Sequence, residues 1–174
     1  MKQDKGNDCL MSVDGTDFRV KVKGKEWYSY KFKKGAVRYE VALCILTGDI
    51  VWINGPYEPG IWNDIEIFRN SLMSHLGPME RVEADDGYIG EAPRHVKCPR
   101  SIAEHADDDT AKEIKQRLRN RQETVNMRFK MWGALAQPFR NEVTKHGGAF
   151  RAIAVIVQLS INQGERLFDV DYDD

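Results

Sequence analysis

The sequence predicts a single α/β domain, and three observations support this prediction. Apolar runs rich in β-branched and aromatic residues, typical of strands, occupy much of the first half of the chain. Apolar residues spaced three and four positions apart, typical of amphipathic helices, follow them. The chain has 174 residues, of which 41% are apolar, which is enough for one packed core. Strands followed by a helix, a further strand and more helices indicate an α/β fold.

Strands are predicted at four places. The first covers residues 9–13 and ends at Asp14. Residues 37–46 and 50–53 form two strands joined by a tight turn at Thr47-Gly48-Asp49. A loop rich in Gly and Pro follows at residues 54–60, and the last strand covers residues 81–84.

Three helices are predicted after the first three strands. The first covers residues 64–76 and ends before Gly77-Pro78. The second begins near Thr110 and runs to about Gln137, with an apolar stripe made of Leu118, Val125, Phe129 and Trp132. The third is a buried helix at residues 150–161, although its β-branched residues also suit a strand. Residues 90–109 are polar and irregular, and we expect residues 1–8 and 166–174 to be polar tails around a domain at 9–165.

Composition excludes several classes of protein. The 26 basic and 27 acidic residues give a net charge of −1, so a generally basic nucleic-acid coat is excluded but a local patch is not. No apolar run is long enough to span a membrane, and the start lacks the apolar stretch of a signal peptide. The three cysteines form no CxxC pair, so we expect neither a zinc knuckle nor a disulfide framework. The sequence also lacks a P-loop and a GxSxG elbow.

The stretch at residues 21–34 interleaves six lysines with four aromatic residues. Basic and aromatic side chains together can form a platform for nucleic acid. The favoured interpretation is a hairpin with a buried aromatic face and a solvated lysine face.

Three acidic residues are candidates for a metal site. Asp14 and Asp85 each follow a predicted strand, and Glu123 lies on the long helix away from its apolar stripe. Active groups of α/β sheets gather beyond the carboxyl ends of strands, and clustered carboxylates repel one another unless a cation lies between them. Oxygen ligands suit Mg²⁺ or Mn²⁺, and two such ions can support cleavage of a phosphodiester. The simpler alternatives are an Asx turn at Asp14, a turn at Asp85, and a solvated helix face at Glu123 paired with Arg119.

At these residues the sequence resembles the DDE endonuclease domain of eukaryotic Harbinger-type transposases. Five motifs carry the resemblance in the family's order across residues 9–165: SVDGTDF, VRYEVALCILTGDIVWINGPY, PGIWNDIEIFR, ADDGYIG and RNRQETVNMRFKMW. The resemblance implies an RNase H-like mixed sheet flanked by helices. It implies that Asp14, Asp85 and Glu123 hold two Mg²⁺ or Mn²⁺ ions and that the reactions are DNA cleavage and strand transfer. It also implies a nuclear location.

The sequence departs from the family at the third motif and in the segment before Asp14, and one further position is ambiguous. Many relatives have His before the Asp of the third motif, whereas this chain has Asn63-Asp64, so Asp64 is a secondary candidate. Asp86 competes with Asp85 for the second position, and the motif spacing favours Asp85. Full-length relatives carry a helix-turn-helix segment before the first Asp, and only 13 residues precede Asp14 here. The chain would then be a catalytic domain without its sequence-reading module, and three explanations stay open: a fragment, a decayed copy, or one part of a split system in which a separate protein supplies DNA recognition. A homo-oligomer is a further possible partner.

Basic residues around Glu123 are the candidates for contacts with DNA phosphates. Arg119, Arg121 and Lys130 are expected to steady the backbone, and the alternative is an ordinary salt-bridged helix surface. Two other functions stay open. One is a catalytically inactive DNA-binding or protein-interaction module, and the other is an α/β metal-dependent phosphatase of a different fold.

Overall fold

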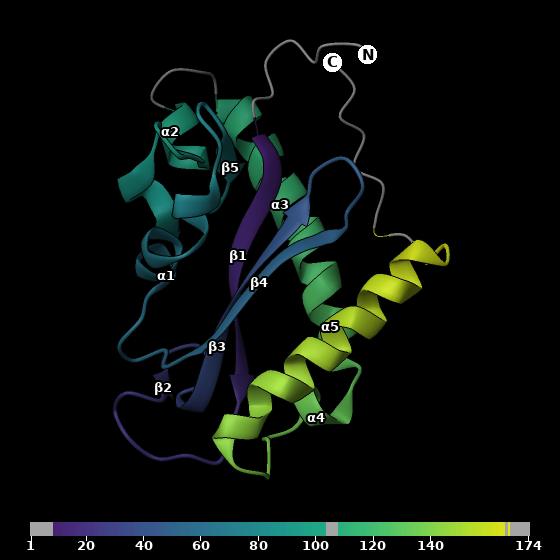
Figure 1. The fold of residues 1–174 in the computed structure, drawn as a ribbon. Helices are drawn as coiled ribbons and strands as arrows, with labels where there is room; N and C mark the ends of the chain where they lie inside the picture. The colour runs from purple at the N-terminus through teal and green to yellow at the C-terminus, as the bar shows by residue number, and fades with distance from the viewer. Residues whose placement is uncertain (1–8, 104–107, 166, 168–174) are drawn as a thin grey trace.

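A computed structural model describes residues 9–103, 108–165 and 167 (Figure 1). The expected tails at residues 1–8 and 166–174 therefore lie, except for Leu167, outside the described residues. The strands are β1 (Cys9–Arg19), β2 (Tyr28–Ser29), β3 (Lys34–Cys44), β4 (Ile50–Tyr57), β5 (Arg81–Glu83) and β6 (Val96–Lys97). The α-helices are α1 (Asp64–Asn70), α2 (Pro99–Ala103), α3 (Asp108–Lys130), α4 (Gly133–Ala136) and α5 (His146–Asn162). The 3-10 helices are η1 (Leu72–His75), η2 (Asp86–Glu91) and η3 (Val143–Lys145).

The strands form one mixed sheet, so the predicted α/β class is confirmed. The order runs β2-β3-β1-β5-β6, and β4 also pairs with β3. The pairs β1–β3 and β3–β4 are antiparallel, whereas β1–β5 and β5–β6 are parallel. The predicted turn between residues 46 and 50 is present, with Gly48 at a φ of +76°, a conformation that favours glycine.

The first strand is longer than its sequence predicts. β1 continues through Asp14 to Arg19, because β3 pairs with it along its whole second half, from Asp14 opposite Val41 to Arg19 opposite Ala36. Asp14 therefore lies within a strand and not at its end. Likewise β4 runs to Tyr57, into the segment predicted as a loop.

The other edge of β1 is covered only in part. Parallel β5 pairs with β1 at Cys9–Ser12 and stops there, and Phe139 pairs with Val20 at the opposite end. Between these two partners, the described chain places no strand beside residues 13–18 on that edge. We call this interval the β1 gap.

Two hydrophobic cores cover the two faces of the sheet, and Figure 1 shows α1 and α2 on one side and α3, α4 and α5 on the other. The larger core packs Phe18, Tyr39 and Val41 of the sheet against Phe129 of α3 and Phe150 of α5. The smaller core packs sheet residues against α1 and the segment that contains Tyr88. Residues on a strand alternate between its two faces. Val13, in the smaller core, and Gly15, which faces Asp64, therefore point to one face, and Asp14 between them points to the other.

The predicted helices differ from the structure mainly at their ends, whereas α2 lies in the segment 90–109 that was predicted to be irregular. The predicted helix at 64–76 is divided into α1 and η1. The long helix ends at Lys130, and Trp132 is 41% exposed and caps α4, so its place in the apolar stripe was wrong. Val125 and Phe129 are buried as predicted, and the side chain of Leu118 lies outside the described part. The buried helix at 150–161 is confirmed as part of α5.

The segment between β1 and β3, residues 20–33, is hereafter called the basic loop. Its strand ladder with β3 contains only the two residues of β2, with single backbone hydrogen bonds of Val20 and Trp27 beside it, so the predicted hairpin is only a short ladder. Trp27 packs against the larger core, but Tyr30 is 83% exposed. The predicted burial of the aromatic residues is therefore wrong for Tyr28 and Tyr30, which are both exposed. No helix in the described ranges is long and apolar enough to cross a membrane.

Candidate functional site: an acidic cavity at the β1 gap

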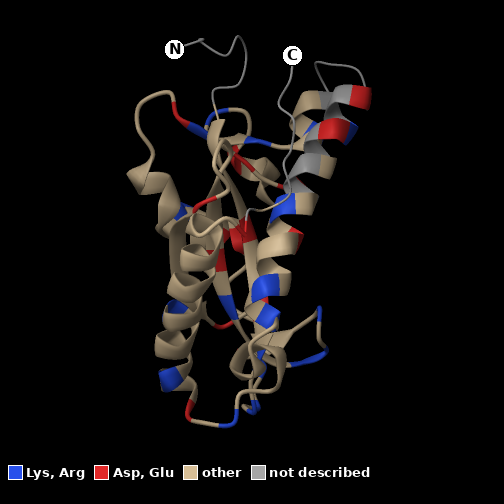
Figure 2. Cartoon of the chain, turned by 90° about the vertical axis from the view of Figure 1, so that its right-hand side faces the viewer, with Lys and Arg blue, Asp and Glu red and all other residues tan. Residues whose placement is uncertain are grey.

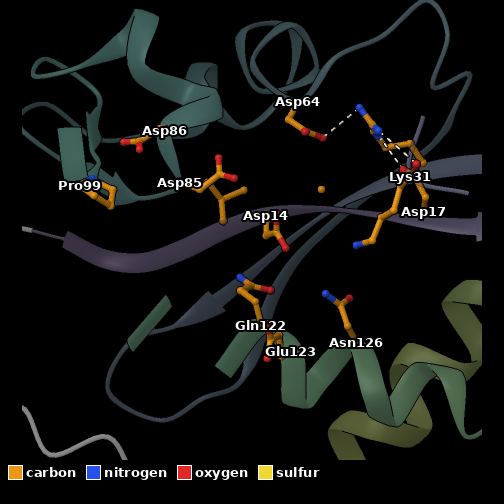
Figure 3. Close-up of a pocket in the computed structure, with 13 residues that line it drawn as sticks. Asp14, Asp17, Lys31, Asp64, Asp85, Asp86, Pro99, Gln122, Glu123 and Asn126 are labelled. Atoms are coloured by element: carbon orange, nitrogen blue, oxygen red, sulfur yellow. Dashed lines mark hydrogen bonds and ion pairs between the residues drawn. The ribbon is translucent and has the colours of Figure 1, made fainter. Parts of the chain in front are cut away.

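A cavity of about 460 Å³ lies at the β1 gap. Its walls come from β1, the basic loop, β3, the start of α1, the segment after β5, the start of α2 and the middle of α3 (Figure 3). The charged residues that line it are Asp14, Asp17, Lys31, Arg38, Asp64, Asp85, Asp86 and Glu123. All five acidic candidates from the sequence therefore reach the same cavity.

Asp14 is the central carboxylate of the cavity. Its pKa is raised to about 7, first by burial and then by the negative charges of Asp64 and Asp85. Lys31 and the backbone N–H of Gly15 act in the opposite direction. The sequence placed Asp14 at a strand end, whereas it is exposed to the cavity because β5 stops opposite Ser12.

Asp64 belongs to this acidic group, although the sequence ranked it only as a secondary candidate. It is the first residue of α1, whose start is fixed by a capping box between Asn63 and Glu66. Burial raises the pKa of Asp64, and Arg38 lowers it. Gly15 lies directly against the Asp64 carboxylate, and a Cβ atom at position 15 would collide with Asp64 Oδ1. The glycine that follows Asp14 thus makes the space in which Asp64 can approach β1.

Arg38 holds Asp64 in place from β3. Its Nε donates to Asp17 Oδ1 at 2.7 Å, and its Nη1 lies 3.4 Å from Asp64 Oδ1 and donates to the Trp62 carbonyl at 3.3 Å. Asp17 is buried, so the pair is shielded from water on that side. Arg38 is a positioning residue that the sequence did not indicate, because its partners are far away in the chain.

Asp85 and Asp86 have different roles after β5. Asp85 follows the strand by two residues, caps η2 through Gly87 N at 2.8 Å, and lies beside Asp14 in Figure 3. Asp86 Oδ1 accepts the backbone N–H of Arg100 at the start of α2, at 2.8 Å. Only Asp85 of the two is among the charges that raise the pKa values of Asp14 and Asp64. This geometry favours Asp85 over Asp86.

Glu123 reaches the cavity from α3, at its margin. Its side chain is exposed, and in Figure 3 it lies on the opposite side of Asp14 from Asp64 and Asp85. The neighbouring Gln122 is buried and donates to the carbonyl and the hydroxyl oxygen of Ser12, at 3.2 and 3.3 Å. Asn126, one turn after Gln122, also lines the cavity. The structure therefore adds two amides that the sequence did not single out.

The basic candidates on α3 are distributed differently from the prediction. Arg121 is only 6% exposed, and its guanidinium donates to the carbonyls of Cys44 and Ile45 at the end of β3. This burial corrects the prediction that Arg121 contacts DNA. Lys130 is partly exposed, and partial burial and the nearby Lys31 lower its pKa. Arg119 lies in α3, but its side chain is outside the described residues.

Lys31 is the cation that sequence reasoning did not assign to the site. Its side chain extends from the basic loop into the cavity (Figure 3), and its charge lowers the pKa values of Asp14 and Asp64. The signal was present in the basic and aromatic stretch, but the fold was needed to bring it beside Asp14.

The lining suits hard divalent cations, because its possible ligands are carboxylate and amide oxygens. In the described ranges, no three His, Cys, Asp or Glu side chains are close enough together to hold one ion. Mg²⁺ commonly uses only one or two protein carboxylates and completes its shell with water and substrate phosphates. The negative charges of Asp64 and Asp85 contribute to the raised pKa of Asp14, and a bound cation would relieve this repulsion.

Comparison with known proteins adds no assignment: no protein family, curated protein or solved structure matches this chain.

Proposed function

We propose that this chain is a divalent-metal-dependent DNA endonuclease domain that is related to the catalytic domain of Harbinger-type transposases. The observation that carries the proposal is the meeting of Asp14, Asp64 and Asp85 in one cavity, where their repulsion helps to raise the pKa of Asp14 to about 7. The mixed sheet with helices on both faces supports the RNase H-like fold that the resemblance implies. DNA cleavage and strand transfer are the proposed reactions.

Asp14, Asp85 and Glu123 would hold two Mg²⁺ or Mn²⁺ ions, and Asp64 is available as a further oxygen ligand. When bound, such ions supply an activated water and neutralise charge that develops on a phosphodiester. Lys31 would pair with a phosphate oxygen at the cavity, since its ammonium group already faces the carboxylates. Arg38 would keep Asp64 oriented, and the Asn126 amide would be free to turn toward the substrate.

The partners remain predictions. DNA, a separate DNA-reading protein, a homo-oligomer and a nuclear location all follow from the resemblance.

Titration of Mn²⁺ by calorimetry tests the proposal, with Asp85→Asn and Asp86→Asn as a matched pair. Asn keeps the shape of Asp, and its side-chain oxygen can still accept from Gly87 N or Arg100 N. We expect Asp85→Asn to weaken Mn²⁺ binding by about tenfold or more, because a carboxylate charge that would touch the ion is lost, and Asp86→Asn to change it little. Equal effects of the two substitutions would contradict the assignment of Asp85.

Cleavage of plasmid DNA completes the test. Asp14→Asn and Glu123→Gln should abolish Mn²⁺-dependent cleavage, while Glu142→Gln, an exposed carboxylate away from the cavity, should not. Unchanged cleavage in Glu123→Gln would show that Glu123 is not a required metal ligand, and Asp64 would take its place in the proposal. A wild-type protein that binds no Mn²⁺, with or without DNA, would overturn the proposed function and leave a non-catalytic module.

A further inference from the structure

The basic loop presents an exposed and strongly charged surface that the cavity chemistry does not explain. Five lysines lie in it, all exposed, against a single acidic residue, Glu26. Tyr30 is 83% exposed, and its ring packs edge-on with that of Tyr28 at a centroid distance of 5.3 Å. The two rings thus form a small aromatic patch among the lysines, and an exposed apolar patch rimmed by polar residues is typical of a binding surface.

The loop is held firmly despite its short strand. Ser29 Oγ donates to the buried Asp17 at 2.5 Å, and the Trp27 carbonyl accepts the Ala36 N–H at 2.8 Å. The Glu26 carbonyl accepts the Gly60 N–H, also at 2.8 Å. These contacts fix the backbone before Tyr30, and after it the Lys33 N–H donates to the Ser29 carbonyl at 2.8 Å, so the exposed ring is displayed at a set place.

The loop also leads directly into the cavity. Lys31 follows Tyr30 and extends toward Asp14, and Lys130 at the end of α3 is close enough for the two ammonium groups to repel each other. Arg19, at the end of β1, is a third cation near Lys130. Figure 2 shows basic residues frequent toward the end of the molecule opposite the two termini, and acidic residues gathered nearer its middle.

Neighbouring cations that repel one another attract an anion with closely spaced charges, such as a chain of phosphates. An exposed tyrosine beside them suits the face of an unpaired base, because every base can stack on an aromatic ring. In a duplex the bases are stacked on each other, so Tyr30 would have no base face to meet.

We propose that the basic loop is a platform for single-stranded DNA, on which Tyr30 stacks an unpaired base while Lys31 and Lys130 hold the adjoining phosphates. This inference deepens the proposed function, on which it rests for the identity of the polymer, and it specifies that the strand entering the cavity is unpaired there. The platform itself needs no metal.

Fluorescence anisotropy in EDTA tests it, with a labelled single strand of about 15 nucleotides and the corresponding duplex. We expect the single strand to bind more tightly than the duplex. Tyr30→Ala should weaken single-strand binding by about tenfold, and Tyr30→Phe should leave it near the wild-type value, because the ring face is kept. Lys31→Gln should reduce the slope of log affinity against log salt concentration by about 0.7, the value for one lost phosphate contact with a single strand.

Arg94→Gln is the control for charge, since Arg94 is exposed but lies between η2 and β6, away from the basic loop. Unchanged single-strand binding in Tyr30→Ala, or equal binding of duplex and single strand, would overturn the proposal. Binding of the protein to phosphatidylserine vesicles that depends on Tyr30, with no binding to DNA, would also overturn it. The loop would then be a membrane-contact surface.

Calorimetry with Mn²⁺ separates the two proposals. Tyr30→Ala should bind Mn²⁺ as the wild type does. Single-strand binding that depends on Tyr30 in a protein that binds no Mn²⁺ would refute the nuclease proposal and leave the platform intact.

Discussion

Glu40 is buried on β3, opposite Gly15 of β1, with one carboxylate oxygen satisfied and the other not. Its Oε2 accepts from Trp52 Nε1 at 2.9 Å and from Ser71 Oγ at 2.8 Å, whereas Oε1 has no hydrogen-bond partner in the described part of the chain. Burial raises the pKa of Glu40 to about 7, and the charge of Asp64 acts in the same direction. The folded protein therefore keeps the Glu40 carboxyl group protonated to a higher pH than the unfolded chain does.

This pKa makes a prediction about stability and pH. The unfolded chain releases the Glu40 proton near pH 4.5 and the folded protein near pH 7, so the folded state binds more protons between them. The contribution is complete below pH 4.5 and is lost as the pH rises through 7, by at most about 3 kcal/mol. Glu40→Gln removes this loss, so the variant should gain stability relative to the wild type between pH 5 and pH 8.

Urea unfolding of both proteins across that pH range measures the difference, in which the contributions of other titrating groups largely cancel. His146 is the main opposing group, since burial lowers its pKa to about 4 and its contribution to stability is lost as the pH falls below about 6.5. Parallel curves for wild type and Glu40→Gln would show that Glu40 ionises normally.

Single residues of the site were predictable to different extents. Asp14 and Asp85 stood out because the motif spacing marks them, and both reach the cavity. Asp64 was undervalued because the space that admits it comes from Gly15, a long-range fact that no local pattern records. Arg121 was misassigned because its charge was taken as a sign of exposure, although it lies three residues after Leu118 and four before Val125, on the face of the predicted apolar stripe.

Among the elements, α3 has two structural roles: it anchors the sheet and it lines the cavity. Arg121 donates to two carbonyls where β3 ends, and Gln122 donates to Ser12 on β1. The next turn carries Asn126 and then Lys130 toward the basic loop. The helix would therefore place its ligands correctly only while its anchor holds.

Arg121→Met keeps the aliphatic part of the side chain but removes the charged donor from the carbonyls of Cys44 and Ile45, so it should destabilise the protein by about 2–4 kcal/mol. Lys112→Met on the same helix is the matched control, since Lys112 has a 66% exposed side chain and should change stability by less than about 0.5 kcal/mol. Urea denaturation measures both. A surface arginine that binds DNA would show the reverse pattern, with stability retained and DNA affinity lost.

Element boundaries followed the sequence where local signals decided them. The turn at Gly48 and the start of α1 were found because Gly and the Asn63 cap act locally. The second half of β1 was missed because a charged segment becomes a strand only through its pairing with β3. α3 ends at Lys130 rather than near Pro138 because the chain turns at Trp132 to start α4.

Across the whole molecule, the net charge of −1 is the sum of an acidic region and a basic region that lie apart. The acidic residues that matter lie in the cavity at the β1 gap, and the lysines lie in the basic loop at its side. Composition excluded a uniformly basic surface but carried no information on this separation. The α/β class was predictable because periodicity reports it, whereas the β1 gap was not, since it depends on where a parallel strand stops.

The β1 gap has a consequence for the exchange of backbone hydrogens with solvent. Residues 13–18 belong to a strand buried between two cores, yet every second amide there points to the open edge, where the described chain has no paired strand. Those amides should exchange with deuterium well before the ones that face β3, although both sets lie in the same strand. Two-dimensional NMR after dilution into deuterated buffer would resolve them, and uniform protection along β1 would contradict the idea. Addition of Mn²⁺ with a single DNA strand should slow the early set selectively, so the central strand would report directly on occupancy of its own open edge.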